Sequence, residues 1–153
     1  MGNGGTVKTL DFSGFTEQWS SPIDFTLYGD FIVSSGMTVA ISARIMTCAA
    51  SSGTQKITTN GLNLGGLGIN VNGGSTVQLQ DNATMDTIIL TNGTLDLNGK
   101  TFTGATSSSG VMSTAAGTKT LLFNGGTIVN RNSSTTAWNN AAPTGFTTVA
   151  GTA

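Results

Sequence analysis

A glycine turn recurs in this chain at one constant spacing, at Gly29, Gly61, Gly93 and Gly125. Tyr28 precedes the first glycine and asparagine precedes the other three, and a short apolar strand follows each turn. A unit of one strand, a turn and another strand cannot bury its own apolar face, so stacked neighbours must complete the core. An apolar residue stands four positions before each glycine, and we expect these four residues to form one interior column: Phe25, Ile57, Ile89 and Leu121.

The segments between the turns are typical of β-strands. Short runs of Thr, Val, Ile, Leu and Phe are separated by Asn-Gly, Gly-Gly or Ser-Gly, which is the pattern of strands and turns. In the run from Thr76 to Gln80, Val77 and Leu79 alternate with polar residues, so they share one face of a strand. Strong helix formers such as Glu and Lys are scarce. The sequence therefore predicts an all-β protein.

The predicted fold is a β-solenoid, similar to a parallel β-helix, with a degenerate repeat of about 32 residues. We expect a single domain over 1–153, with four degenerate repeats in 21–153 and an N-terminal cap or partial repeat in 1–20. Asn and Gly at the turns suit the left-handed conformation that a tight corner requires. The alternative is an antiparallel β-sandwich or jelly roll, because Asn-Gly is also the strongest signal for a hairpin turn.

The composition excludes several functional classes. The chain has no histidine, so it holds no Ser-His-Asp triad and no imidazole metal ligand. Only 8% of the residues are charged, and six scattered Lys and Arg cannot form the basic face that nucleic acids require. The apolar runs are far shorter than a membrane span, and the N-terminal MGNGGTVKTL lacks the apolar core of a secretion signal. We therefore expect that the chain binds no nucleic acid, no membrane and no cofactor.

The carboxylates do not gather in the sequence. Asp24 and Asp30 flank one turn, and Asp81 and Asp86 flank another, which is typical of solvated turn acids. Gly99-Lys100-Thr101 lacks the spacing of a phosphate-binding loop and is typical of a β-turn. The sequence therefore predicts no catalytic residues and no metal site. A carbohydrate-active β-helix enzyme is the weaker alternative, and it would need two carboxylates facing each other in a groove.

Three kinds of single residue also yield expectations. Trp19 and Trp138 lie in polar contexts near the two ends, where each either caps the solenoid or contacts a sugar ring by stacking. Lys56, Lys100 and Lys119 stand at or near strand starts, where solvated charges discourage wrong pairing. Cys48 is expected to be a small buried core residue and not a reactive thiol.

Several phrases of the sequence resemble a known class of repeat protein. They are TIILTNGTLDLNGKTFTG, AAGTKTLLFNGGTIV, AWNNAAPTGFTTVAGTA and the opening KTLDFSGFTEQW. They resemble tandem modules of very long repetitive proteins that tailed phages encode and that occur in marine environmental sequence. The resemblance implies a non-catalytic structural or adhesin-like role in a phage tail fibre or on a capsid surface. It carries no functional residues with it.

The expected partners follow from the fold and from that resemblance. A short solenoid has two open ends, so we expect self-association through ends or β-edges, or binding to other virion proteins. A host-surface glycan is a further expected partner, and the expected location is the virion surface or the extracellular space. The alternative is a bacterial cell-surface or secreted adhesin built from the same kind of repeat.

Overall fold

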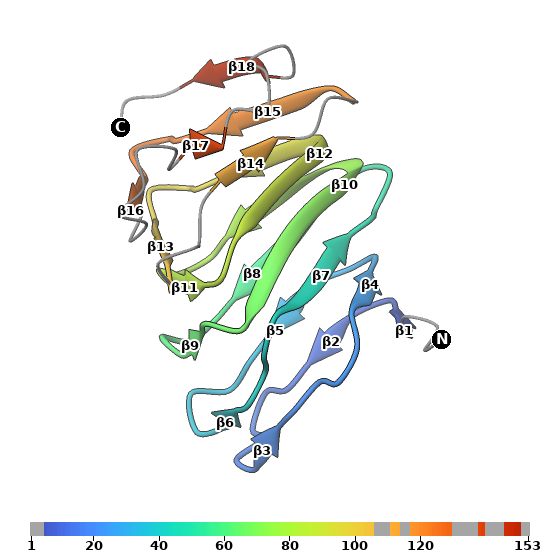
Figure 1. Cartoon of the computed structure of the whole chain (residues 1–153), viewed down its shortest axis with the longest axis vertical. Coiled ribbons are helices and arrows are strands. Elements are labelled where there is room, and N and C mark those ends of the chain that lie inside the picture. The colour runs from blue at the N-terminus through green and yellow to red at the C-terminus, as the bar shows by residue number, and fades with distance from the viewer. Residues whose placement is uncertain (1–4, 106–110, 114–116, 130–137, 140–145, 151–153) are drawn as a thin grey trace.

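The chain is described here by a computed structural model that covers residues 5–105, 111–113, 117–129, 138–139 and 146–150, with side chains in 5–105 and 117–129. Every regular element in these ranges is a β-strand, and every strand pair is parallel. The strands form coils stacked along one axis (Figure 1). The chain is therefore a parallel β-solenoid, as the sequence predicted, and the antiparallel sandwich is excluded.

Each coil carries strands on up to three faces. Face 1 holds β1 (Gly5–Val7), β4 (Phe25–Leu27), β7 (Arg44–Cys48), β14 (Val111–Ser113) and β17 (Trp138–Asn139). Face 2 holds β2 (Leu10–Asp11), β5 (Phe31–Ile32), β8 (Thr54–Thr58), β15 (Lys119–Leu122) and β18 (Phe146–Ala150). Two long strands bend across both faces, namely β10 (Leu67–Leu79) and β12 (Ile88–Asp96). Face 3 holds β3 (Gln18–Trp19), β6 (Thr38–Val39), β9 (Asn63–Leu64), β11 (Ala83–Met85), β13 (Thr101–Gly104) and β16 (Thr127–Val129).

The coils follow the chain order. Coil 1 consists of β1 to β3, coil 2 of β4 to β6, coil 3 of β7 to β9, coil 4 of β10 and β11, and coil 5 of β12 and β13. The equivalent positions on face 1 of these coils are Gly5, Phe25, Met46, Ile69 and Ile88. One coil therefore takes about 20 residues, and each coil pairs only with its neighbours, which is the usual order of a solenoid.

Inward side chains stack in columns along the axis because paired parallel strands are in register. On face 1, Val7, Leu27, Cys48, Val71 and Leu90 form one such column. On face 2, Leu10, Phe31, Ile57 and Leu79 form another. The members from coils 2 to 5 are fully buried, whereas Val7 and Leu10 are half-buried. The core is a narrow rod of apolar side chains between the three faces.

The expected column of Phe25, Ile57, Ile89 and Leu121 is wrong. Phe25 points inward from face 1, whereas Ile57 and Leu121 point inward from face 2 in two different columns. Ile89 is half-buried and alternates with the inward residues Ile88 and Leu90 of β12. The reason is the length of a coil, because the constant spacing of the glycines spans roughly one and a half coils. The sequence period therefore alternates between two sides of the solenoid.

The four glycines of the sequence repeat serve two different corners. Gly29 and Gly93 lie where face 1 meets face 2, and a Cβ on Gly93 would come within 2.7 Å of the Ser75 carbonyl oxygen. A Cβ on Gly29 would collide with the Lys8 carbonyl oxygen. Glycine is therefore required at this corner because the backbones of successive coils approach closely.

Gly61 and Gly125 lie at the corner between faces 2 and 3, in a tight turn. Asn60 and Gly61 have φ values of 49° and 76°, and the Leu62 amide donates to the Thr59 carbonyl at 3.0 Å. Asn124-Gly125 repeats this turn, and so does Asn98-Gly99, which lies outside the regular spacing. Two consecutive residues with positive φ define the type I′ turn, for which Asn-Gly is preferred. The left-handed corner is thus confirmed for Asn60 and Asn124.

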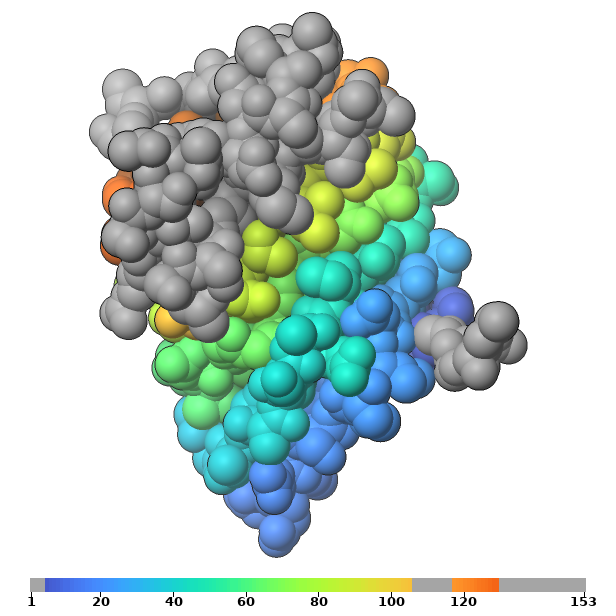
Figure 2. All heavy atoms as spheres, viewed as in Figure 1, coloured from blue at the N-terminus to red at the C-terminus, as the bar shows by residue number. Residues whose placement is uncertain are grey.

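Residues 5–19 form coil 1 and pair in parallel with coil 2 on all three faces. The sequence left open whether this region is a cap or a partial repeat. The described residues 5–19 form a complete coil that covers one side of coil 2. This end tapers in the space-filling view, where coil 1 is dark blue (Figure 2).

Candidate functional site

Most acidic side chains join one coil to the next. Asp24 Oδ1, just before β4, accepts the Ile45 amide of coil 3 at 2.9 Å. Asp30 Oδ1, just before β5, accepts the Lys56 amide of coil 3 at 2.8 Å. The two carboxylates thus cap the starts of strands on two different faces. They do not flank a single turn as expected, because β4 lies between them, and each has a structural partner one coil further along the chain.

The turn expected between Asp81 and Asp86 is wrong, because strand β11 on face 3 lies between them. The Asp81 carboxylate accepts the Thr59 amide at 2.9 Å, the Thr59 hydroxyl at 3.1 Å and the Asn60 amide. It therefore holds the Asn60-Gly61 turn of coil 3 from coil 4. Asp86 follows the other end of β11, and its own amide donates to the Leu67 carbonyl. The contacts of the Asp81 carboxylate therefore hold the corner between faces 2 and 3.

Asp96 is the most buried carboxylate of the described residues, at 7% exposure. Its Oδ2 accepts Gln78 Nε2 of coil 4 at 2.9 Å. Its Oδ1 accepts the Asn98 amide at 2.8 Å and Asn124 Nδ2, also at 2.8 Å. Asp96 therefore connects three successive coils at the corner that carries the Asn-Gly turns. Sequence reasoning missed this role, for which the only signal is an acid two residues before an Asn-Gly turn.

Gln55 is a second polar junction that sequence reasoning missed. It is 1% exposed and points into the core at the start of β8. Its Nε2 donates to the carbonyl oxygens of Leu27 and Gly29 in coil 2, at 3.0 and 2.9 Å. Its Oε1 accepts the Ala50 amide at 3.1 Å and the Ser75 hydroxyl of coil 4 at 3.2 Å. The signal was strand alternation, because Gln55 lies two residues before the inward Ile57.

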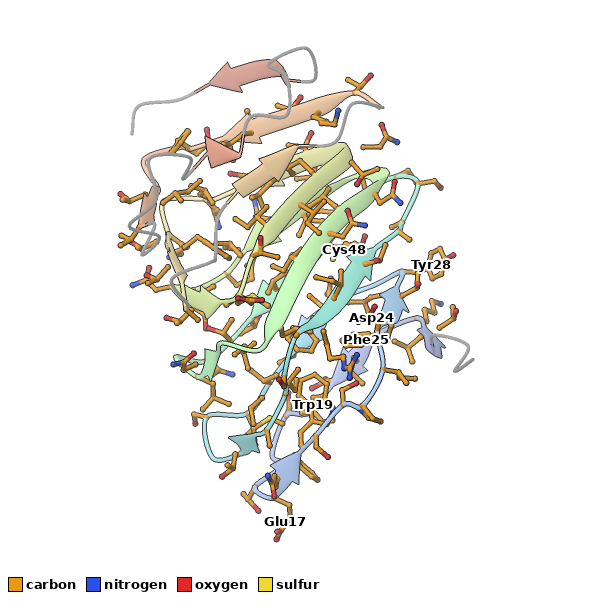
Figure 3. The ribbon with its side chains drawn as sticks, in the orientation of Figure 1. Glu17, Trp19, Asp24, Phe25, Tyr28 and Cys48 are labelled. Carbon is orange, nitrogen blue, oxygen red and sulfur yellow. The ribbon has the colours of Figure 1, made fainter. Side chains whose placement is uncertain are left out.

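Trp19 lies in an aromatic cluster at the end of the core. Its ring centroid is 5.0 Å from that of Phe12, 6.2 Å from Phe25 and 5.9 Å from Phe31. Phe12 in turn lies 5.8 Å from Phe15, which is 37% exposed. Trp19 is half-buried, and Figure 3 shows it near Phe25 and away from Glu17 at the tip of coil 1. These contacts favour packing against the end of the core over stacking on a sugar ring.

Trp138 is placed only by its backbone. It pairs in register with Val111 on face 1, and its side chain lies outside the described residues. The expectation of a cap or a sugar contact at Trp138 therefore stays a prediction.

Cys48 is confirmed as a core residue. Its thiol is buried between Leu27 and Val71 in the face 1 column, and burial raises its pKa from 9.0 to about 12. A thiol with such a pKa is protonated at neutral pH, so it is a poor nucleophile.

The three lysines differ from one another. Lys56 is exposed and Lys100 half-buried, as expected for strand starts, and the Lys100 amide closes the Asn98-Gly99 turn at 2.8 Å. The solvated position expected for Lys119 is wrong, because this residue is fully buried. Strand alternation explains it: Lys119 lies two residues before the inward Leu121 in β15, and its Nζ lies 3.4 Å from the Gly117 carbonyl oxygen.

Neither a metal cluster nor a membrane helix is found in the part of the chain that the structure describes. No group of three or more Asp, Glu, Cys or His side chains there could hold a metal ion. No helix there is long and apolar enough to cross a membrane. The polar side chains of the described coils instead hold backbone groups of neighbouring coils.

The fold and these contacts place the described chain in the class of parallel β-solenoids, with polar side chains that form hydrogen bonds between successive coils. No family model, no curated protein and no solved structure matches this chain.

Proposed function

We propose that this chain is a non-catalytic structural or adhesive module of a virion, in a phage tail fibre or on a capsid surface. It acts as a stiff rod and assembles through its β-edges or ends with further copies or other virion proteins. The sequence resemblance to tandem phage modules suggests this setting. A host-surface glycan is the ligand class that an adhesive form of the module would contact.

One observation supports the proposal most strongly. Carboxylates of the described residues accept hydrogen bonds from the chain itself, among them those of Asp11, Asp24, Asp30, Asp81 and Asp96. Glycoside hydrolysis needs a pair of carboxylates that face the substrate from two sides. Carboxylates that hold backbone amides instead contribute to the stability of the stack.

The test is to locate the protein. Antibodies raised against the folded chain should label purified virus particles in electron micrographs, at tail fibres or on the capsid. Labelling of the bacterial envelope in uninfected cells would contradict the proposal and favour the adhesin. A second assay incubates the chain with cell-surface polysaccharides and measures new reducing ends. Their release by the folded chain, absent from a heat-denatured sample of the same preparation, would overturn the non-catalytic role.

A further inference from the structure

Coil 1 presents strand edges that have partners on one side only within the described chain. β1, β2 and β3 each pair with coil 2 and with no other described strand. The carbonyl oxygens of Val7, Glu17 and Trp19 accept amides of coil 2, and the Leu10 amide donates to the Asp30 carbonyl. Backbone direction alternates along a parallel strand, so the amides and carbonyls of the intervening residues face the opposite side. These residues are Thr6, Asp11 and Gln18.

The apolar core is only partly covered at the same end. In coil 2, Leu27, Phe31 and Val33 are 0% exposed. The corresponding coil 1 residues Val7 and Leu10 are half-buried. Phe12, Phe15 and Trp19 extend the core as an aromatic layer above Phe25 and Phe31. The strands of this end contain neither proline nor lysine, which commonly protect a free sheet edge.

Among the described strands, β17 matches this end in register on face 1. On face 1, one column of register positions runs through Thr6, Thr26, Thr47, Asn70 and Ile89 to Met112 and Asn139. On face 2, β18 continues the ladder that β15 forms with β12. All these pairs are parallel, so β17 offers on face 1 the strand direction and the two column positions, Trp138 and Asn139, that coil 2 offers to Gly5 and Thr6. On face 2, β18 has the same direction but ends in the column of Lys56, one position before the column of Leu10.

We propose that coil 1 of one copy docks on a second copy through β1 against β17, so that chains stack head to tail. The inference rests on the proposed role of a module that assembles through its ends, and it names the end, the partner and the polarity. For the parallel pairing to continue, the second copy must be related to the first by a translation along the solenoid axis. Because a head-to-tail interface of this kind does not close on itself, it generates open filaments.

Two cysteine variants test the polarity directly. In a stack, Thr6 of one copy follows Asn139 of the next in the same column, at the strand spacing of about 4.8 Å, which suits a disulfide. Thr6→Cys and Asn139→Cys are purified separately, mixed and mildly oxidised. We expect a disulfide-linked dimer containing one chain of each kind, identified by its mass. The native Cys48 is buried and should not compete.

The controls make each outcome decisive. Thr26→Cys lies in the same column but in coil 2, and it should give no product with Asn139→Cys. A product from Thr6→Cys alone would show two coil 1 ends meeting and would overturn the stated polarity. No product in the mixture, with both variants folded by circular dichroism, would overturn the stacking.

A backbone variant provides an independent measurement. Thr6→Pro removes an amide that points away from coil 2, so the fold should be retained while self-association in sedimentation velocity weakens about tenfold. Thr6→Val keeps the amide and should associate like the wild type. A wild-type chain that sediments as a monomer at all concentrations would contradict the proposal. Cross-linking without antibody labelling of virions would leave the stacking intact and refute only the virion setting.

Discussion

Coil 1 and coils 3 and 4 carry strands on the same three faces but differ greatly in burial. Leu10, Ile57 and Leu79 occupy one column on face 2, yet Ile57 and Leu79 are 0% exposed while Leu10 is half-buried. The local sequence does not cause the difference, because each position is an apolar residue in a strand. A coil in the middle is covered from both sides and coil 1 from one side. Burial in this fold is therefore a property of neighbouring coils.

The largest expected difference concerns two glutamines. Gln55→Leu leaves the Ala50 amide and the carbonyls of Leu27 and Gly29 without their side-chain partner inside the core. Loss of buried hydrogen-bond partners should lower the free energy of unfolding by about 4 kcal/mol, measured by urea denaturation. Gln18→Leu in coil 1 is the matched control, since Gln18 is exposed, and it should change stability by less than about 0.5 kcal/mol. Equal effects would contradict the role assigned to Gln55.

A leucine pair sharpens the same comparison within one column. Leu79→Ala should cost about 3 kcal/mol, because it leaves a cavity in a position closed by coils on both sides. Leu10→Ala should cost about 1 kcal/mol, because its side chain is already half in water. Chemical denaturation of both variants measures the difference. If the two costs were the same, coil 1 would be covered in solution as fully as coil 4.

The buried thiol predicts a pH dependence. Below pH 9 the Cys48 thiol is protonated in the folded and unfolded chain, so it does not affect stability. Above pH 9 the unfolded chain releases the proton, while the folded chain, with a pKa of about 12, keeps it. Stability should fall as pH rises from 9 toward 12, by roughly 1 kcal/mol at pH 10. Denaturation of the wild type and of Cys48→Ala at pH 8 and pH 10 isolates this contribution. An equal loss in both proteins would refute it.

The smallest expected difference is between two turn glycines. Gly14 in coil 1 and Gly61 in coil 3 have φ values of 79° and 76°, and a Cβ at either position would meet no atom within 4 Å. Alanine at either position should therefore cost about 1 kcal/mol through backbone strain alone. Thermal denaturation of Gly14→Ala and Gly61→Ala should show similar shifts. A much larger shift for Gly61 would mean that local conformation, too, depends on the neighbouring coils.

Much of the fold could be predicted from local signals. Alternation within the strand runs and the Asn-Gly turns indicated stacked strands, and both signals depend only on adjacent residues. The coil length could not be predicted in the same way. Gly29 is needed for a close backbone approach and Gly61 for a positive φ, so identical letters mark two different corners. The constant spacing of these glycines therefore predicted a repeat that is about one and a half times as long as a coil.

The polar junctions were harder to predict than the core. Gln55 and Lys119 point inward because strand alternation from Ile57 and Leu121 places them there, against the usual exposure of their residue types. Asp96 is recognisable only when Gln78 and Asn124 from the adjacent coils lie beside it. Such a site depends on the register between coils, which no single segment of sequence contains.

The restriction of pairing to adjacent coils also determines how this rod would respond to force. A pull on the N-terminal end would detach coil 1 from coil 2 without disturbing coil 4, since no described strand of coil 1 pairs beyond coil 2. Each coil of about 20 residues would release roughly 70 Å of extended chain. The force trace should therefore be a series of small, similar steps, so the solenoid would lengthen gradually under load and would not fail in a single event.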